Sequence, residues 1–249
     1  MTWKDHPLLP PLARAERLGL ITDMDGTISQ IVPVPADAKP TERSRNLLQA
    51  LHDQLTLVAV VSGRSAADVA ARVNLPDLVY IGNHGLERWQ DGRVHLAPQA
   101  APYRAQLEVA AAALRSYLED GMWIEDKGAT LSIHYRNAAD PQAAAGAFKP
   151  HVEQIAAAQH LRVFQGRMIF ELRPPIEVNK GTALRALVEE FSLTAAVYIG
   201  DDTTDADALR MARHLRETGV CQALALGVDS DDVPEAVADS SDLLVCGLV

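Results

Sequence analysis

The sequence predicts an α/β protein in which a parallel β-sheet is flanked by helices and carries a smaller inserted α+β domain. Short, continuous apolar runs alternate with helical patterns towards both ends of the chain. That alternation is typical of buried parallel strands joined by helical crossovers. From about residue 88 to 172, by contrast, apolar and polar residues alternate around central glycines, which indicates half-exposed antiparallel hairpins.

Five apolar runs predict the strands of the parallel sheet, and four helical patterns predict its helices. The strands are expected at 18–23, 55–62, 78–83, 195–201 and 223–228, and the helices at about 41–53, 65–73, 181–191 and 204–217. In such sheets a ligand binds beyond the carboxyl ends of the strands. The N-terminal stretch HPLLPPL is expected to be an extended arm.

Three hairpins are expected in the middle of the chain. ERWQDGRVHL (87–96) contains an Asp-Gly turn, and WIEDKGATLSIHYR (123–136) and LRVFQGRMIFELR (161–173) have central glycines. Alanine-rich helices are expected at about 103–119 and 141–158. We therefore expect a core domain over 1–88 and 173–249 and an inserted domain over 89–172, with Trp89, Trp123 and Tyr135 in the core of the insert.

Composition excludes several classes of protein. The chain has 249 residues, of which 48% are hydrophobic, and its formal net charge of -10 argues against a nucleic-acid partner. No apolar stretch approaches the roughly 18–20 residues of a membrane span, and the N-terminus does not resemble a signal peptide. Two cysteines, Cys221 and Cys246, predict a reduced, cytoplasmic setting. The oligomeric state stays open, with a monomer as one candidate.

An acidic pair follows the first predicted strand. In LITDMDGTIS (20–29), Asp23 and Asp25 alternate along an extended backbone and should point to the same side. Gly26 permits a tight turn, and the Thr27 hydroxyl can hydrogen-bond a ligand or the backbone. One aspartate here could be an ordinary turn residue, but the whole string indicates a functional site.

A second acidic cluster, GDDTTDADAL (200–209), follows the fourth predicted strand. Asp201 and Asp202 end the strand, and Asp205 lies one helical turn further on. One acid could serve as a helix cap, whereas three, placed near Asp23, call for a hard divalent cation. Oxygen ligands suit Mg²⁺, and the cysteines and histidines lack zinc-ligand spacing.

Two further motifs can hold an anion. VVSGRS (60–65) places Ser62 and Gly63 at a strand end, where a hydroxyl and amide groups can bind phosphate oxygens; the alternative is a serine turn before a helix capped at Ser65. VNKGTAL (178–184) places Lys180 at a helix start, where an anion would offset the helix dipole. By itself Lys180 could be a surface lysine.

Together and in this order, the four motifs resemble those of the haloacid dehalogenase-like phosphohydrolases, so a Rossmann-like core with a cap is implied. The resemblance implies that Asp23 is a nucleophile and that Asp25 is a general acid and base. It implies a Mg²⁺ ion held by Asp23, the Asp25 carbonyl and Asp201, with support from Asp202 and Asp205. Ser62, Gly63 and Lys180 would bind the phosphoryl group.

The sequence also closely resembles the trehalose-6-phosphate phosphatases, and the insert lies at one of the positions where this superfamily has a substrate-selecting cap. The segments GNHGLE (82–87), IEDKGATLSIHYR (124–136), GRMIFELRP (166–174) and NKGTAL (179–184) carry this resemblance. It implies sugar or phosphate contacts from Glu125, Lys127, Arg136 and Glu171. These could instead be solvated cross-strand charge pairs.

The resulting hypothesis is a Mg²⁺-dependent phosphatase that releases trehalose from trehalose 6-phosphate. The first motif departs from the family at Met24, where tyrosine is usual, so a related enzyme for sucrose phosphate, a glycosyl-phosphoglycerate or a hexose phosphate is the nearest alternative. A catalytically silent sugar-phosphate sensor is the alternative from another class, although a sensor needs no nucleophile such as Asp23.

Overall fold

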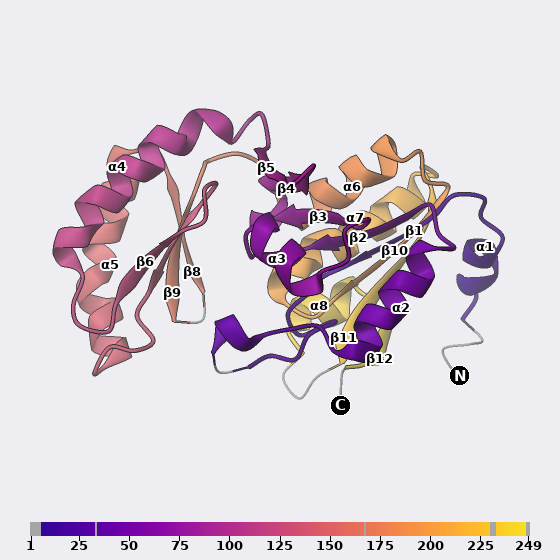
Figure 1. Cartoon of the computed structure of the whole chain (residues 1–249), viewed down its shortest axis with the longest axis horizontal. Coiled ribbons are helices and arrows are strands. Elements are labelled where there is room, and N and C mark those ends of the chain that lie inside the picture. The colour runs from indigo at the N-terminus through magenta and orange to yellow at the C-terminus, as the bar shows by residue number, and fades with distance from the viewer. Residues whose placement is uncertain (1–5, 33, 167, 230–232, 248–249) are drawn as a thin grey trace. The chain divides into compact units, whose positions relative to one another are not determined.

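The chain folds into two compact units, which are described separately. A computed structural model describes residues 6–32, 34–166, 168–229 and 233–247. Leu96–Glu177 forms the second unit, and the described residues on either side of it in the sequence form the first (Figure 1). No helix among the described residues is both long enough and apolar enough to span a membrane.

The first unit is built on an eight-stranded sheet with the order β12-β11-β10-β1-β2-β3-β4-β5. Six of these strands are parallel: β1 (Leu18–Thr22), β2 (Leu57–Val61), β3 (Val79–Gly82), β10 (Ala195–Gly200), β11 (Gln222–Asp229) and β12 (Leu243–Cys246). The five predicted strands are confirmed. Strand β1 lies between β10 and β2, so that Leu20 is aligned with Val197 on one side and Val58 on the other.

Helices cover both faces of this sheet, as the predicted helical patterns require. The helices are α1 (Leu9–Ala13), α2 (Glu42–His52), α3 (Ala66–Val73), α6 (Lys180–Glu190), α7 (Ala206–Glu217) and α8 (Glu235–Ser240), with short 3-10 turns η2 (Pro35–Asp37), η3 (Asn83–Gly85) and η6 (Thr203–Asp205). Strand β2 is buried throughout. Val58 and Val60 pack against α2 and α3, while Ala59 and Val61 pack against α6 and α7.

The predicted N-terminal arm is wrong in part, because Leu9–Ala13 is a helix. Two prolines lie in its first turn, where a missing backbone N–H costs no intrahelical hydrogen bond. Leu12 is buried and packs with Ala195 and Leu224. Burial of this leucine, which no local pattern reveals, favours a helical turn over an extended arm.

The first predicted hairpin is confirmed, but it belongs to the large sheet. Strands β4 (Glu87–Gln90) and β5 (Arg93–Leu96) follow β3 in the sheet order, and β4 pairs antiparallel with β3. Asp91 and Gly92 both have positive φ, at 52° and 74°, as a two-residue hairpin turn requires. Trp89 packs with the apolar cluster of the first unit, and not within the insert.

The second unit is a four-stranded antiparallel sheet with helices on one face. The sheet order is β6-β7-β9-β8, formed by β6 (Trp123–Asp126), β7 (Leu131–His134), β8 (Arg162–Gly166) and β9 (Ile169–Arg173). The helices are α4 (Arg104–Leu114) and α5 (Pro141–Ala158), with 3-10 turns η4 (Ala101–Tyr103) and η5 (Arg115–Tyr117). Both predicted hairpins and both helices are confirmed.

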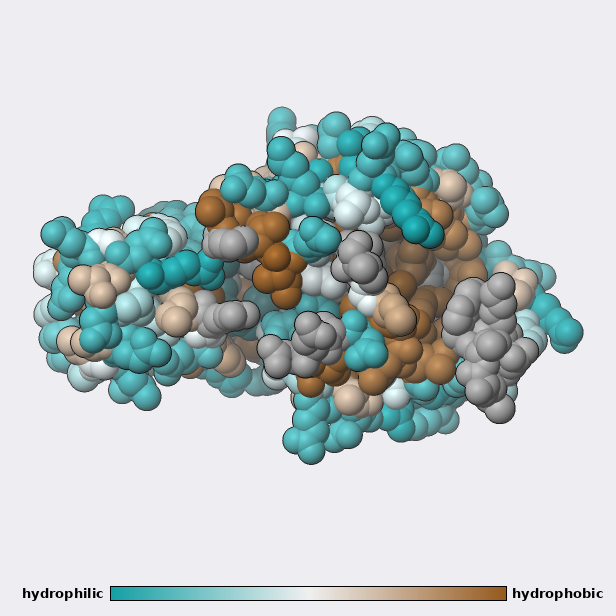
Figure 2. All heavy atoms as spheres, turned by 90° about the horizontal axis from the view of Figure 1, so that it is seen from below, coloured by the Kyte–Doolittle hydropathy of each residue, from teal (hydrophilic) through white to brown (hydrophobic). Residues whose placement is uncertain are grey.

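In this unit α4 and α5 cover the same face of the sheet (Figure 1). Their apolar side chains pack on Leu131, Ile133, Phe170 and Leu172, which alternate along β7 and β9. Tyr135 belongs to this core, as expected, but Trp123 does not: it is 39% exposed and stacks on His134. Hydrophilic side chains cover most of the part of this unit that Figure 2 shows.

Candidate active site

The carboxyl ends of β1, β2 and β10 lie next to one another, and each is followed at once by a polar residue. Asp23 follows β1, Ser62 follows β2 and Asp201 follows β10. The Asp23 amide donates to the Ile199 carbonyl at 2.8 Å, which continues the pairing of β1 with β10 up to the site. The topology thus gathers residues from three distant parts of the chain at one edge of the sheet.

A tight turn after β1 sets the two aspartates of the first motif. The amides of Ile28 and Ser29 both donate to the Met24 carbonyl, at 3.0 and 2.9 Å. Met24 is fully buried in the cluster beneath α2 and α3. Gly26 has φ of 83°, and a Cβ there would lie 1.9 Å from Asp201 Oδ2. Glycine is therefore required both by the backbone conformation and by the closeness of the second acidic motif.

Lys180 joins the two acidic motifs. It is the first residue of α6, which Asn179 and Thr182 cap reciprocally. Although only 2% exposed, it donates from Nζ to Asp23 Oδ1 at 2.8 Å and to Asp205 Oδ1 at 2.7 Å. Burial would lower the pKa of Lys180, but these two carboxylates outweigh it and raise that pKa. The ammonium group therefore stays charged and pairs two buried acids.

Asp205 accepts hydrogen bonds on both carboxylate oxygens. Oδ1 accepts from Lys180 and from the Tyr198 hydroxyl at 2.6 Å, and Oδ2 accepts from the Asp202 amide at 3.0 Å. Asp202 itself is exposed. An acid with both oxygens occupied in this way is suited to positioning Lys180.

Burial and mutual repulsion raise the pKa values of the acids. Burial and the charge of Asp205 raise the pKa of Asp23 well above its ordinary value, although Lys180 acts in the opposite direction. Burial, with repulsion from Asp205, raises the pKa of Asp201 to about 6, although the Thr27 hydroxyl donates to Asp201 Oδ1 at 2.8 Å. The cluster carries more negative charge than its surroundings neutralise.

This donor set fits a hard divalent cation. Asp23, Asp201 and Asp205 each offer a carboxylate oxygen, and these atoms lie within 4.8 Å of one another. Carboxylate oxygens are hard ligands of the kind that suits Mg²⁺. Two of the three acids, Asp23 and Asp201, belong to the predicted metal set.

The Asp25 side chain takes a different partner. Both of its carboxylate oxygens accept from Arg64: Oδ2 from Nε at 2.6 Å and Oδ1 from Nη2 at 3.0 Å. Sequence reasoning missed Arg64, although the arginine two residues after Ser62 was a visible signal.

The serine motif is held by the turn that follows β3. Ser62 is buried, and its Oγ accepts from the Arg64 amide at 3.2 Å. The amides of Asn83 and His84 donate to the carbonyls of Arg64 and Ser62, at 2.7 and 3.0 Å. Asn83, His84 and Gly85 all have positive φ, at 47°, 59° and 112°. Strained backbone of this kind is concentrated at functional sites.

His84 also touches the serine motif through its ring. A Cβ on Gly63 would lie 2.6 Å from His84 Cε1, so the imidazole lies directly on this glycine. Sequence reasoning did not place His84 among the site residues. The ring is buried, and its contact with Gly63 places it among the residues that shape the predicted phosphate loop.

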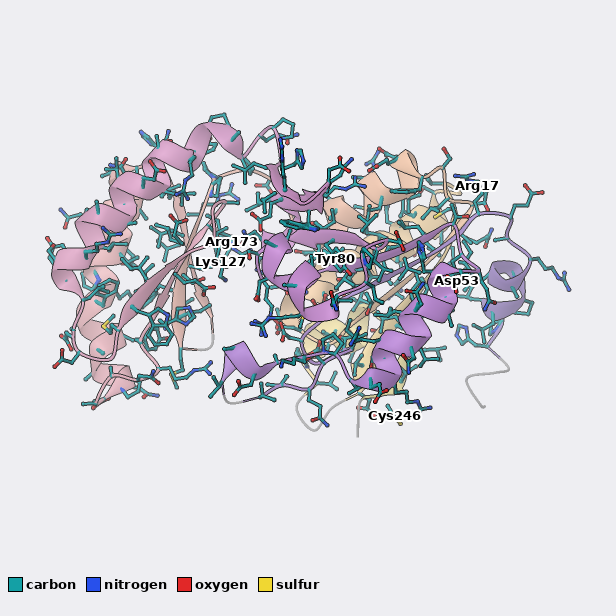
Figure 3. All side chains as sticks on the ribbon, viewed as in Figure 1. Arg17, Asp53, Tyr80, Lys127, Arg173 and Cys246 are labelled. Atoms are coloured by element: carbon teal, nitrogen blue, oxygen red, sulfur yellow. The ribbon has the colours of Figure 1, made fainter. Side chains whose placement is uncertain are left out.

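In the second unit, predicted sugar contacts lie on the sheet face opposite α4 and α5. The strand register aligns Glu125, Ser132 and Glu171 in one row across β6, β7 and β9. Lys127 Nζ lies 3.5 Å from Glu171 Oε1, and Arg173 Nε donates to Glu171 Oε2 at 2.7 Å. Figure 3 shows Lys127 and Arg173 on this sheet.

The remaining polar residues of this face differ in their surroundings. Glu125 Oε2 lies 2.8 Å from His134 Nε2. The buried Ser132 hydroxyl has no hydrogen-bond partner among the described residues. Arg136 lies two residues beyond β7, outside the row, and is half-buried. Three of the four predicted contacts, Glu125, Lys127 and Glu171, thus lie on the side of this sheet opposite α4 and α5.

Comparison with known proteins agrees with this architecture. A family model described as Trehalose-phosphatase matches residues 21–239. A trehalose-phosphate phosphatase of Mycobacterium marinum is 40% identical over 200 residues, which are 77% of this chain and 50% of the relative. The chain therefore spans about half the length of that curated relative.

Solved structures show the same fold. The C-terminal domain of a trehalose-6-phosphate phosphatase from C. albicans superposes with a TM-score of 0.77 at 21% identity, covering 96% of this chain and 91% of the other. A haloacid dehalogenase-like hydrolase from Bacteroides thetaiotaomicron has a TM-score of 0.61 at 16% identity, covering 93% and 95%. The fold is thus haloacid dehalogenase-like. Because the family model also spans most of the chain, including both acidic motifs, the chain belongs to the trehalose-phosphatase family.

Proposed function

We propose that this chain is a Mg²⁺-dependent phosphatase that hydrolyses trehalose 6-phosphate to trehalose and phosphate. The observation that carries the proposal is the buried pairing of Asp23 with Lys180 beside Asp201, in a chain of the trehalose-phosphatase family. A buried carboxylate at a sheet edge, held by a fixed cation, has the chemistry of a nucleophile in phosphoryl transfer.

Two steps account for the reaction. In the first, a carboxylate oxygen of Asp23 attacks phosphorus, the bond from phosphorus to the sugar oxygen breaks, and Asp25 gives its proton to the leaving alkoxide. In the second, Asp25 takes a proton from water, whose oxygen attacks the aspartyl-phosphate and releases phosphate and Asp23. Ser62, the Gly63 amide and Lys180 bind the phosphoryl oxygens throughout.

The cation would be held by Asp23, the Asp25 carbonyl and Asp201, with Asp202 and Asp205 supporting it. It supplies positive charge that offsets repulsion between the carboxylates and the incoming phosphoryl group. The raised pKa values of Asp23 and Asp201 support this assignment, since acids that repel one another in a buried site favour a cation.

The second unit would act as a cap that selects the sugar. Carboxylates accept hydrogen bonds from sugar hydroxyls and ammonium groups donate to them, so Glu125, Lys127 and Glu171, with Arg136 beyond the row, are the proposed contacts. A buried carboxylate such as Glu171, already oriented by two cations, is preorganised for this purpose.

The test is a panel of sugar phosphates with phosphate detection, run with Mg²⁺ and with excess chelator. Trehalose 6-phosphate should have the highest kcat/KM, and chelation should stop turnover. A preference for sucrose phosphate, a glycosyl-phosphoglycerate or a hexose phosphate would reassign the substrate. Binding of a sugar phosphate without turnover in Mg²⁺ would favour the silent sensor. The cytoplasmic location that the two cysteines predict is a separate proposal, which cell fractionation tests.

A further inference from the structure

The planar guanidinium group of Arg64 forms a bidentate hydrogen bond with the Asp25 carboxylate. Its Nε donates to Asp25 Oδ2 at 2.6 Å and its Nη2 donates to Asp25 Oδ1 at 3.0 Å. The side chains of Arg64 and Asp25 are 18% and 34% exposed, so the pair is partly shielded from water. Two parallel charge-assisted bonds fix the plane of a carboxylate as well as its position. A single lysine contact would not do so.

The guanidinium group of Arg64 is also held by Asp68, which in turn contacts Arg72. Arg64 Nη1 donates to Asp68 Oδ2 at 3.1 Å, and Arg72 Nε donates to the same oxygen at 2.8 Å. Asp68 is partly buried, which alone would raise its pKa, but the two guanidinium groups outweigh this and lower it. Arg72 Nη1 donates in turn to the carbonyls of Ala36 and Ala38, at 2.8 and 2.7 Å.

These contacts form one line of alternating charges that ends on Asp25. Each member restrains the next. The carbonyls of Ala36 and Ala38 hold Arg72, Arg72 holds Asp68, and Asp68 holds Arg64. A surface ion pair of long side chains contributes little to stability because both partners remain mobile. Here Arg64 has its guanidinium fixed on two sides, so the arrangement gives Asp25 a defined direction.

We propose that Arg64 is the positioning residue of Asp25, and that it serves the two proton transfers and not the attack of Asp23 on phosphorus. The inference rests on the proposed function, in which Asp25 is the acid and base. When Asp25 carries its proton, one carboxyl oxygen still accepts from Arg64 while the other presents the proton to the leaving alkoxide. Proximity and orientation of this kind account for much of the effect of a general acid.

The test separates the two chemical steps with two substrates. The leaving group of trehalose 6-phosphate is an alkoxide, which needs a proton from the acid. The leaving group of p-nitrophenyl phosphate is a stable phenolate, which does not. With the aryl phosphate, Arg64→Gln should release about one equivalent of nitrophenolate per site at a rate within about threefold of the parent. Slow turnover should follow, because the base for water is misplaced. With trehalose 6-phosphate, kcat should fall by about 10–100-fold, without such a burst.

Matched variants identify the cause. Asp25→Asn should show the same aryl-phosphate burst and a deeper loss, and Arg64→Lys should recover only part of the kcat. Arg72→Gln, one link further away, should lower kcat in the same direction but less. Arg185→Gln removes an exposed guanidinium that is paired with Glu189 at 2.8 Å, and it should leave the kinetics with both substrates unchanged. Melting temperatures of all variants exclude loss of the fold as the cause.

Three results would overturn the inference. They are parent-like turnover of trehalose 6-phosphate by Arg64→Gln, an equal loss of burst and steady-state rates with the aryl phosphate, or parent-like turnover by Asp25→Asn. If the parent chain turns over the aryl phosphate but not trehalose 6-phosphate, the proposed substrate is wrong. The aryl-phosphate burst still decides the role of Arg64 in that case, so the two failures are distinguishable.

Discussion

The Asp23 carboxylate is buried beside Asp205 and Asp201, and Lys180 is the cation that contacts it. Burying an acid among acids is unfavourable unless each has a partner. The site therefore stores unfavourable electrostatic energy in its free state and relieves it when a cation binds. Two predictions belong to the scale of single residues, one on the role of Asp23 and one on the electrostatics of Asp201.

Asp23→Asn should abolish turnover while leaving the fold intact. An amide cannot form the acyl-phosphate, and the substitution keeps the shape and the hydrogen bond from Lys180. We expect kcat to fall by at least about 10³-fold, on the scale of losing a covalent nucleophile. Phosphate release, measured on protein with a parent-like melting temperature, checks this. Substantial residual activity would contradict the covalent mechanism.

Asp201→Asn should stabilise the cation-free protein more at about pH 8 than at about pH 4.5. Burial and Asp205 raise the pKa of Asp201 to about 6 in the folded state, from 3.8. A raised folded-state pKa contributes stability below the unfolded pKa, and this contribution is lost as pH rises through the folded value. The neutral amide avoids that loss.

The measurement is the difference in melting temperature between parent and Asp201→Asn, in chelator, across this pH range. The lowered pKa values of carboxylates such as Asp68 and Asp242 make stability fall towards low pH. Their contribution is the same in both proteins and cancels in the difference. A difference that is constant with pH would show that Asp201 does not ionise in this window.

Residues in recognisable strings could be predicted, and their partners could not. Asp23, Lys180 and Asp201 stand at strand or helix ends that hydrophobic patterning locates, so their convergence follows from a parallel sheet. Arg64 and His84 act through contacts with residues from other segments, at Asp25 and Gly63. Such contacts depend on side-chain directions and on the positive φ angles of the turn at 83–85, which local sequence patterns do not specify.

At the scale of elements, charged side chains gather on the face of the four-stranded sheet opposite α4 and α5. Glu171 is 4% exposed and contacts both Lys127 and Arg173. Paired charges of this kind are costly to bury unless they serve a ligand or specify a structure. We expect them to serve the sugar.

Lys127→Ala and Glu171→Gln should each lower kcat/KM for trehalose 6-phosphate by about 10–100-fold, which corresponds to about 1.4–2.7 kcal/mol. Contacts far from the phosphorus act only on a substrate that carries the sugar, so p-nitrophenyl phosphate should be turned over almost as by the parent. Steady-state kinetics on both substrates provide the measurement.

A control for these variants is Glu153→Gln, in an exposed pair with Lys149 on α5. This substitution should leave kcat/KM unchanged for both substrates. Equal losses on both substrates by Lys127→Ala would mean that the residue supports the fold. No loss on either would return Lys127 and Glu171 to ordinary cross-strand charges.

Elements with strong periodicity were predicted within a few residues, whereas two others required tertiary information. The helix at Leu9–Ala13 forms because Leu12 packs on β10 and β11. The hairpin at 87–96 joins the large sheet because β4 pairs with β3. In both cases the local pattern was compatible with more than one neighbour, and packing with distant strands decided between them.

For the whole molecule, chelation should lower the melting temperature and stop turnover together. A ligand that binds only the folded state stabilises it by RT ln(1 + [L]/Kd), about 2.7 kcal/mol at a concentration of 100 Kd. Thermal unfolding with Mg²⁺, with chelator and with restored Mg²⁺ gives the shift, and Asp201→Asn should remove most of it. Full activity in excess chelator, with metal content checked, would refute the role of the ion.

The order of strands in the large sheet has a consequence for how the chain folds. Strand β1 is paired on one side with β2, its near neighbour in sequence, but on the other with β10, which follows the entire second unit. During synthesis β1 must therefore wait for β10 with one edge uncovered. The second unit is a continuous segment, and if it folds first it draws its two ends together and shortens the loop that β1 and β10 must close. We expect folding of the second unit to precede closure of the large sheet and to set its rate.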